Sequence, residues 1–237
     1  MTDQSVILRP MSMLPRAHKR TAASRESRPN PRAERSAARR DAIIEAAFEE
    51  FSARGFAATR LDDVAQRAGV AKGTIYLHFQ DKEELFQELV RSALGPIIAQ
   101  VELAQFADAP LRVSINQLAG LFVREVLGTR RKDIIRLVIS EGPRFPKVAE
   151  FYYSNIVGRA LAAMRHILQR AVDRGEIKNR IIVRFPQLIV APGILAVIWS
   201  GLFDRFEELD AEAMMQAHLS LLFDALELPA KKTKARA

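Results

Sequence analysis

Cysteine is absent from the 237-residue sequence, which excludes disulfide bonds and metal sites built from thiolates. The sequence also lacks a glycine-rich phosphate loop and any cluster of residues with the spacing of metal ligands. Its four histidines are His18, His78, His166 and His218, and no pattern around them indicates a catalytic set. We therefore expect a binding protein rather than an enzyme, with no cofactor and no metal.

Long uncharged runs are scarce. Near the N-terminus only residues 6–8 are continuously apolar, and this run is too short for the core of a signal peptide. Residues 186–203 carry no charge and reach the lower limit of a membrane span, about 18 residues, but they include a proline, a glycine and polar side chains. This run favours a buried protein–protein helix over a membrane span, and we expect a cytoplasmic protein.

The net charge of +8 is unevenly distributed. Residues 1–40 hold ten Lys and Arg against three Asp and Glu, a net +7, and four more basic residues follow Ala230, which leaves the body at −3. We expect residues 1–35 to be a disordered basic arm and residues 229–237 a basic tail. Two interpretations stay open for these ends. They are solvated segments without a role, or they attract DNA phosphates without sequence preference.

The alternating apolar pattern of strands is also missing. From about residue 36 onward apolar residues recur at helical spacing, separated by glycine, proline and capping residues. The sequence therefore predicts an all-α protein, with a small three-helix unit at 36–82 and a larger helical bundle at 83–228. Gly95-Pro96 indicates a kink or a boundary. The later helices are expected at 111–127, 130–141, 146–174, 186–206 and 210–227.

Residues 59–82 have the pattern of a helix-turn-helix. Thr59 and Asp62 form a capping pair at the start of the first helix, Gly69 supplies the turn, and the second helix is expected at 72–79. The residues expected to close its small core are Ala65, Ala68, Val70, Ile75 and Phe79. The outer side of the second helix then carries groups suited to phosphates and base edges in a major groove.

At these residues the chain resembles the TetR/AcrR family of bacterial transcription regulators. The matching runs are GFAAT (55–59), DVA (63–65), AGVAKGTIYLHF (68–79) and DKEELF (81–86). They lie within about 45 residues, from Arg39 to Phe86, and agree in both spacing and residue type. RLVISEGPRFPKVAEFYY (136–153) resembles, more weakly, the C-terminal domain of an AcrR-like subgroup.

The resemblance implies sequence-specific binding to double-stranded DNA by both helices of the motif. The implied contacts are Thr59, Arg60, Lys72, Gly73, Thr74, Tyr76, Leu77, His78 and Lys82. One position departs from the family, because Ala71 stands where the family often has serine. The missing N-cap hydroxyl costs about 1 kcal/mol. Taken singly, Tyr76 and His78 are also compatible with a core or a plain surface role.

The resemblance also implies a two-fold homodimer formed by the last two helices. Both helices are apolar on more than one face, which favours a four-helix interface over an intramolecular core. The expected interface residues are Leu188, Ile194, Ile198, Leu202, Met214, His218, Leu221 and Leu222.

The remaining helices are expected to enclose a pocket for a hydrophobic or aromatic small-molecule effector. Its expected lining is Phe122, Tyr152, Tyr153, Met164, Trp199 and Phe203. Residues 36–82 are then the DNA-binding domain and residues 83–228 the effector-binding and dimerisation domain. The predicted function is a repressor that the effector releases from a palindromic operator. The alternative is a ligand-independent DNA-binding dimer, or an activator, with the same fold.

Overall fold

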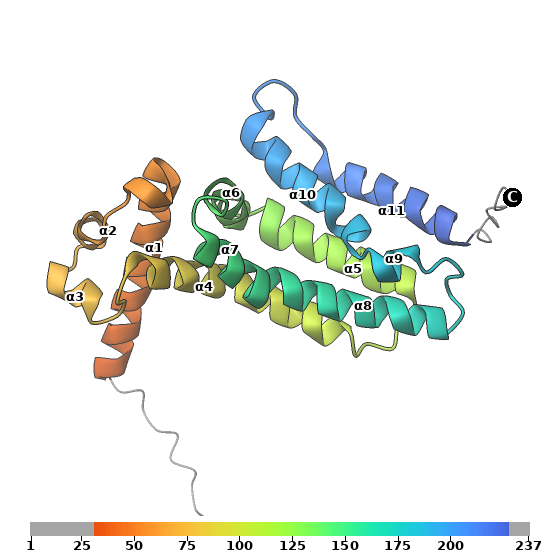
Figure 1. The fold of residues 1–237 in the computed structure, drawn as a ribbon, viewed down its shortest axis with the longest axis horizontal. Coiled ribbons are helices and arrows are strands. Elements are labelled where there is room, and N and C mark those ends of the chain that lie inside the picture. The colour runs from red at the N-terminus through yellow and green to blue at the C-terminus, as the bar shows by residue number, and fades with distance from the viewer. Residues whose placement is uncertain (1–30, 228–237) are drawn as a thin grey trace, which may run out of the picture.

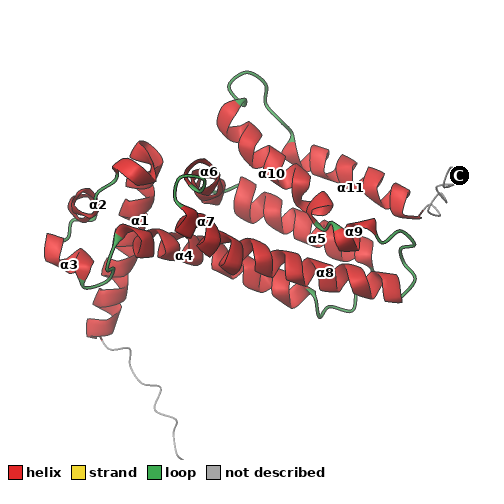
Figure 2. Ribbon diagram, viewed as in Figure 1, coloured by secondary structure: helices red, strands yellow, loops and turns green. Residues whose placement is uncertain are grey.

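The computed structural model describes residues 31–227, and within this range the chain forms helices and no strand (Figures 1 and 2). The first three helices are α1 (Pro31–Ala58), α2 (Leu61–Arg67) and α3 (Lys72–Tyr76). The larger part contains α4 (Lys82–Ala104), α5 (Leu111–Phe122), α6 (Arg131–Glu141), α7 (Pro146–Tyr152), α8 (Gly158–Asp173), α9 (Ile181–Arg184), α10 (Gln187–Leu202) and α11 (Ala211–Glu227). Two π-helical turns, η1 (Val123–Leu127) and η2 (Tyr153–Val157), extend α5 and α7. The predicted all-α fold is confirmed.

The chain folds into a small three-helix unit and a long bundle, which α4 joins by running from one into the other (Figure 1). Both parts share one hydrophobic core. Phe51 and Phe56 of α1 pack edge to face on Phe86 of α4, with ring centroids 5.5 and 5.3 Å apart. The same cluster continues into α6 through Ile134 and Val138. The three-helix unit therefore packs directly against the bundle.

A second core fills the far end of the bundle, between α5, α8 and α11. Leu168 and Leu226 are fully buried there. These packed layers leave one face of α10 and one face of α11 without a covering element within residues 31–227. Among the same residues, no helix combines the length and the apolar character that crossing a membrane requires.

Several boundaries differ from the sequence-based expectation. Residues 31–35, expected to belong to the basic arm, form the first turns of α1. Gly95-Pro96 ends no helix, because α4 continues through it to Ala104. The short helix α9 was not predicted. The rest of the expected arm and the tail at 229–237 lie outside the described residues.

Candidate nucleic-acid interface

The helices α2 and α3 pack against α1 around a small apolar core. Val64 and Ala65 of α2, Ile75 of α3 and Phe79 behind it are all buried. The two helices are joined at Gly69, whose φ of 66° lies in the left-handed region that favours glycine. The expected helix-turn-helix core and its glycine turn are thus confirmed.

The outer side of α3 presents apolar, aromatic and polar groups to solvent. Leu77 is 83% exposed and Tyr76 50% exposed, although Ile75 directly before them is fully buried. The helix ends at Tyr76, and only turns follow it, so it is shorter than the expected 72–79. Its N-cap is Ala71, which makes no side-chain cap bond, as the missing serine hydroxyl requires.

Lys72 begins α3 and lies at the protein surface. Its Nζ donates to Asp62 Oδ2 at 2.7 Å, and this hydrogen bond raises the pKa of Lys72. The lysine is therefore charged at neutral pH. Because the pair is solvent-exposed, a phosphate that approaches α3 competes with Asp62 for the ammonium group.

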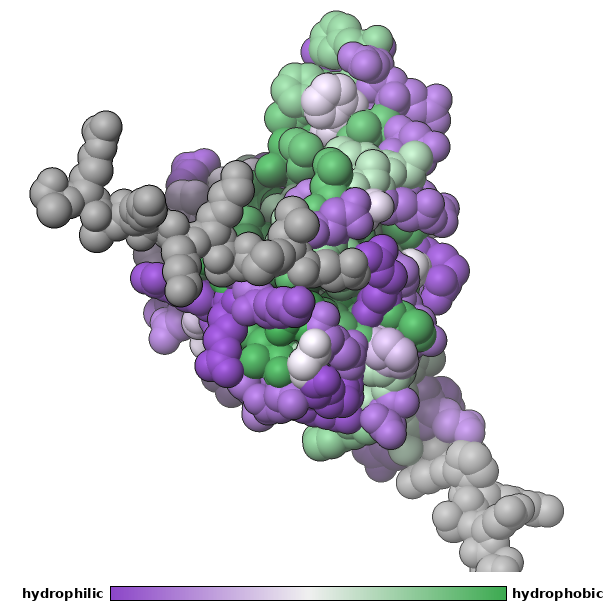
Figure 3. Space-filling view, turned by 90° about the vertical axis from the view of Figure 1, so that its right-hand side faces the viewer, coloured by the Kyte–Doolittle hydropathy of each residue, from purple (hydrophilic) through white to green (hydrophobic). Residues whose placement is uncertain are grey.

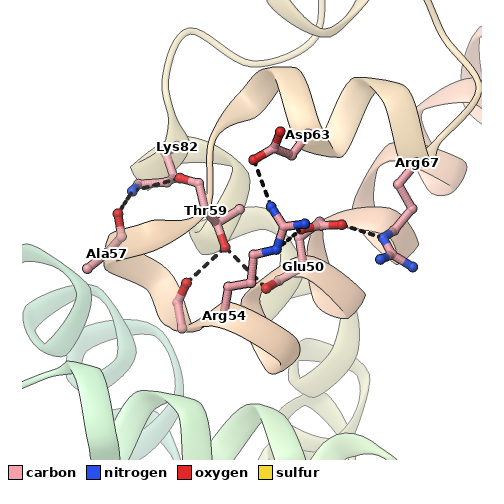
Figure 4. A network of polar contacts seen from close by, with 8 residues as sticks. Glu50, Arg54, Ala57, Thr59, Asp63, Arg67 and Lys82 are labelled. Carbon is pink, nitrogen blue, oxygen red and sulfur yellow. Dashed lines mark hydrogen bonds and ion pairs between the residues drawn. The ribbon is translucent and has the colours of Figure 1, made fainter.

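Thr59 serves the protein interior rather than the DNA surface. Its hydroxyl is buried and donates to the carbonyl oxygens of Gly55 at 2.8 Å and Glu50 at 3.1 Å (Figure 4). The N-cap of α2 is Arg60, without a side-chain cap bond. The expected Thr59–Asp62 capping pair is wrong, and the Thr59 hydroxyl is not exposed to a phosphate.

Lys82 is also turned inward. Its Nζ donates to the carbonyl oxygens of Ala57 and Thr59, at 3.0 Å each (Figure 4). The same atom lies 4.7 Å from the centroid of the Phe56 ring. Burial lowers the pKa of this lysine. Lys82 therefore joins the start of α4 to the end of α1, and its expected contact with a phosphate is not supported by this geometry.

An ion-pair network that the sequence did not reveal fixes α2 on α1. The carboxylate of Glu50 is only 3% exposed and faces Arg67 Nε at 2.6 Å and Arg54 Nε at 3.3 Å. Arg54 also binds Asp63 Oδ2 at 3.1 Å (Figure 4). Glu50 is buried because α2 covers this flank of α1.

Helix α6 holds the three-helix unit at two points. Arg130, at its start, pairs with Glu45 and Glu49 of α1, and its guanidinium lies 4.2 Å from the centroid of the Phe48 ring. Glu141, at its end, lies so close to Gly55 that a Cβ there would come within 2.7 Å of Glu141 Oε1. Helix α6 therefore contacts the middle of α1 and the turn near its C-terminal end.

A cavity of about 610 Å³ opens where α1, α6 and α10 meet. Its lining includes Phe48, Arg130, Arg136, Ile198 and Leu202. A second cavity of about 370 Å³ lies between α5 and α11. Neither is lined by any of the six residues expected to form the effector pocket.

The six expected pocket residues lie in different parts of the molecule. Met164 lies in the core at the far end of the bundle, whereas Phe122 and Tyr152 pack against the other core. Burial raises the pKa of the Tyr152 phenol to about 12, and Tyr153 beside it is 60% exposed. The remaining two, Trp199 and Phe203, pack edge to face at the end of α10. These six positions thus include both core and surface sites.

None of the eight residues expected in a dimer interface is buried. Leu221 of α11 is 73% exposed and Leu202 of α10 is 57% exposed. The His218 ring, on α11, binds the carbonyl oxygen of Leu188 at 2.7 Å, which fixes the two helices to each other. The projecting upper part of the molecule, which holds the α10–α11 connection, carries hydrophobic side chains among polar ones (Figure 3). Phe203 and Phe206 are exposed there, and Leu195 of α10 is exposed as well.

Two family models match the chain. Residues 43–89 match the bacterial regulatory proteins of the tetR family, and residues 108–220 match the tetracycline repressor-like C-terminal domain. The first match covers the helix-turn-helix and the start of α4, and the second covers the bundle from the approach to α5 into α11.

Known proteins are similar over both parts. The transcriptional repressor KstR2 of Mycolicibacterium smegmatis is 28% identical over 146 residues, which are 60% of this chain and 69% of that protein. A TetR-family regulator from Mesorhizobium loti superposes with a TM-score of 0.63 at 24% identity, over 81% of this chain and 96% of its own. The regulator FadR of Bacillus subtilis, solved in complex with stearoyl-CoA, superposes with a TM-score of 0.59 at 23% identity, over 77% and 97% of the two chains. The chain therefore belongs to the TetR family of bacterial regulatory proteins, and it is a DNA-binding regulator of transcription.

Proposed function

We propose that this regulator acts in the cytoplasm as a homodimeric repressor, which binds a palindromic operator and leaves it when a hydrophobic small molecule binds. The observation that carries the proposal is the outer face of α3. Tyr76 and Leu77 are exposed there, whereas Ile75 and Phe79 lock the same segment into the core. Large apolar groups held rigidly at the surface are suited to a DNA groove, where they contact thymine methyls and sugar edges.

The DNA contacts then come from the surface around α3. Lys72, Gly73 and Thr74 begin the helix, Tyr76, Leu77 and His78 follow it, and Arg60 lies exposed at the start of α2. Lys72 and Arg60 supply charge for phosphates, and Leu77 supplies an apolar contact to bases. Thr59 and Lys82 are proposed to act structurally rather than as DNA contacts. They fix the end of α1 and so hold α2 and α3 at the angle that a groove requires.

The dimer is proposed to form through the uncovered faces of α10 and α11. Exposed Leu188, Leu195 and Leu202 follow one another along α10, and Leu221 lies on the adjacent helix α11. Two such helices from each subunit make a self-complementary four-helix interface. A two-fold axis then presents two α3 helices to successive major grooves, about 34 Å apart.

Effector release is proposed to pass through α6. This helix packs in the bundle and holds α1 through Arg130 and Glu141, so a ligand that displaces α6 turns the three-helix unit. The similarity to a regulator solved with stearoyl-CoA supports a long apolar effector as one class to test.

The proposal is tested by selecting bound sequences from random double-stranded DNA with the full chain. We expect a palindrome whose half-sites are centred one helical turn apart, about 10 base pairs. Mobility shifts on that sequence with stearoyl-CoA, free stearate and aromatic compounds then test release, and transcription from a promoter that overlaps the sequence tests repression. No enriched sequence would contradict DNA recognition. An enriched palindrome that no compound class releases would favour the ligand-independent dimer.

A further inference from the structure

The first turns of α1 are basic and reach beyond the helix-turn-helix. Arg32, Arg35 and Arg39 follow one another at spacings of three and four residues, which places them on one stripe of the helix. All three are exposed. At about 100° per residue, Glu34 and Asp41 fall on another side of the same helix. The stripe is thus a local positive surface on a chain whose body carries a small negative charge.

These turns lie at the same edge of the molecule as α3. The guanidinium of Arg40 lies 5.5 Å from the centroid of the Phe79 ring, which directly follows the α3 segment, and it also pairs with Glu88 of α4 at 2.8 Å. Arg40 therefore fixes α1 beside the recognition segment. From this point α1 continues as a helix for nine more residues, about 14 Å at 1.5 Å per residue.

The direction of this extension distinguishes it from the rest of the DNA-binding surface. In Figure 1 the beginning of α1 points downward, whereas the uncovered faces of α10 and α11 lie at the top. A partner subunit on the upper faces leaves the start of α1 pointing away from the two-fold axis. The extension then runs outward along the duplex and reaches about four base pairs beyond the contact of α3, at 3.4 Å per base pair.

The sequence that precedes α1 is also basic. Residues 1–30 contain six Lys and Arg against two Asp and Glu. The basic sequence before Pro31 and the arginine stripe after it carry the same sign of charge, which suits the phosphates of a duplex rather than a neutral or cationic surface.

We propose that the arginine stripe of α1 (Arg32, Arg35 and Arg39) binds the phosphates that flank each half-site on the side away from the two-fold axis. This inference rests on the proposed function, because it assumes the same dimer on the same duplex. The stripe contributes affinity and a longer footprint, not base recognition. It therefore strengthens binding to every sequence to a similar degree.

The test measures operator affinity against salt for the wild type and for the triple variant Arg32→Gln/Arg35→Gln/Arg39→Gln. Each lost phosphate contact reduces the slope of log K against log salt by about 0.9, so six arginines in the dimer account for up to about 5. Shortening the operator by five base pairs at each flank should weaken the wild type and leave the variant unchanged. A second triple variant with Lys at positions 32, 35 and 39 keeps the charge, so its slope of log K against log salt should return most of the way to the wild-type value.

A matched control removes the same charge elsewhere. Arg165, Lys178 and Arg180 are exposed at the far end of the bundle, and their change to Gln should leave the slope at its wild-type value. If the α1 variant keeps the wild-type slope and the wild-type dependence on flank length while it still binds the operator, the stripe does not contact DNA and only this inference fails. If the wild type selects no operator, the proposed function fails first.

Discussion

Thr59 and Lys82 show how a polar residue of a DNA-binding motif can act from inside the protein. The last carbonyl groups of a helix have no partner within it. In α1 the Thr59 hydroxyl satisfies Gly55, and the Lys82 ammonium satisfies Ala57. Both side chains hold the turn between α1 and α2, and so they determine where α3 lies without reaching the DNA themselves.

Replacing Thr59 by Val should therefore affect folding rather than phosphate contact. Valine keeps the shape and removes both hydrogen bonds, so we expect the free energy of unfolding to fall by about 1–2 kcal/mol in urea titrations. Thr59→Ser keeps the hydroxyl and should lose less. The slope of operator affinity against salt should stay at its wild-type value for both. If the slope of operator affinity against salt decreases for Thr59→Val but not for Thr59→Ser, the Thr59 hydroxyl does contact a phosphate.

For single residues, the burial of apolar side chains was predictable from the sequence, whereas the burial of polar side chains was not. The burial of Ile75 and Phe79 followed from their spacing, because only one side of a short helix can face the core. The burial of Glu50 was not predictable, because it depends on α2 and on arginines four and seventeen residues away. Such pairings arise from tertiary packing and leave no periodic signal in the sequence.

Among the elements, α1 changes direction at Gly55 and α6 packs over that point. Gly55 has a φ of 75°, which only glycine adopts without strain, and Glu141 approaches it closely. The long helices were predictable from their apolar stripes and their glycine and proline boundaries. The four-residue α9 and the π turns were not, because one helical turn is too short to show a period.

Gly55→Ala tests this junction. A left-handed backbone costs a non-glycine residue about 1–2 kcal/mol, and the added Cβ must also displace Glu141, so we expect at least this loss in the free energy of unfolding. Gly73→Ala is the matched control. Gly73 has an ordinary φ and nothing within 4 Å of an added Cβ, so it should be neutral or stabilised by up to about 1 kcal/mol. Equal effects of the two changes would mean that the bend at Gly55 is not a constraint.

For the whole molecule, the apolar faces of α10 and α11 lie away from the edge that carries α3 and the start of α1 (Figure 1). This separation lets one surface join two subunits while the other meets DNA. The uncharged run at 186–203 indicated such a surface, and its helix indeed leaves Leu188, Leu195 and Leu202 exposed. The effector pocket could not be located from the sequence, because an apolar side chain fits a core and a cavity equally well.

A charge on the α10–α11 face should separate the subunits. In Leu221→Glu the like charges of the two copies meet across a two-fold interface, so sedimentation should report the 26.6 kDa chain alone rather than twice that mass. Operator affinity should fall at least tenfold, because each monomer binds only one half-site. The control Leu103→Glu changes a residue of similar exposure on α4 and should remain dimeric. A dimeric Leu221→Glu would place the interface elsewhere.

The central claim is that the exposed face of α3 reads the DNA sequence, and Leu77 tests it most directly. Random-sequence selection should be run in parallel with the wild type and Leu77→Ala. Because Leu77 is 83% exposed, the variant should unfold at the wild-type urea concentration. We predict a palindrome for the wild type and, for Leu77→Ala, the same half-site spacing with a weaker preference at one base pair, by about 1–3 kcal/mol. Identical preferences in both selections, or no enriched sequence in either, would contradict the account.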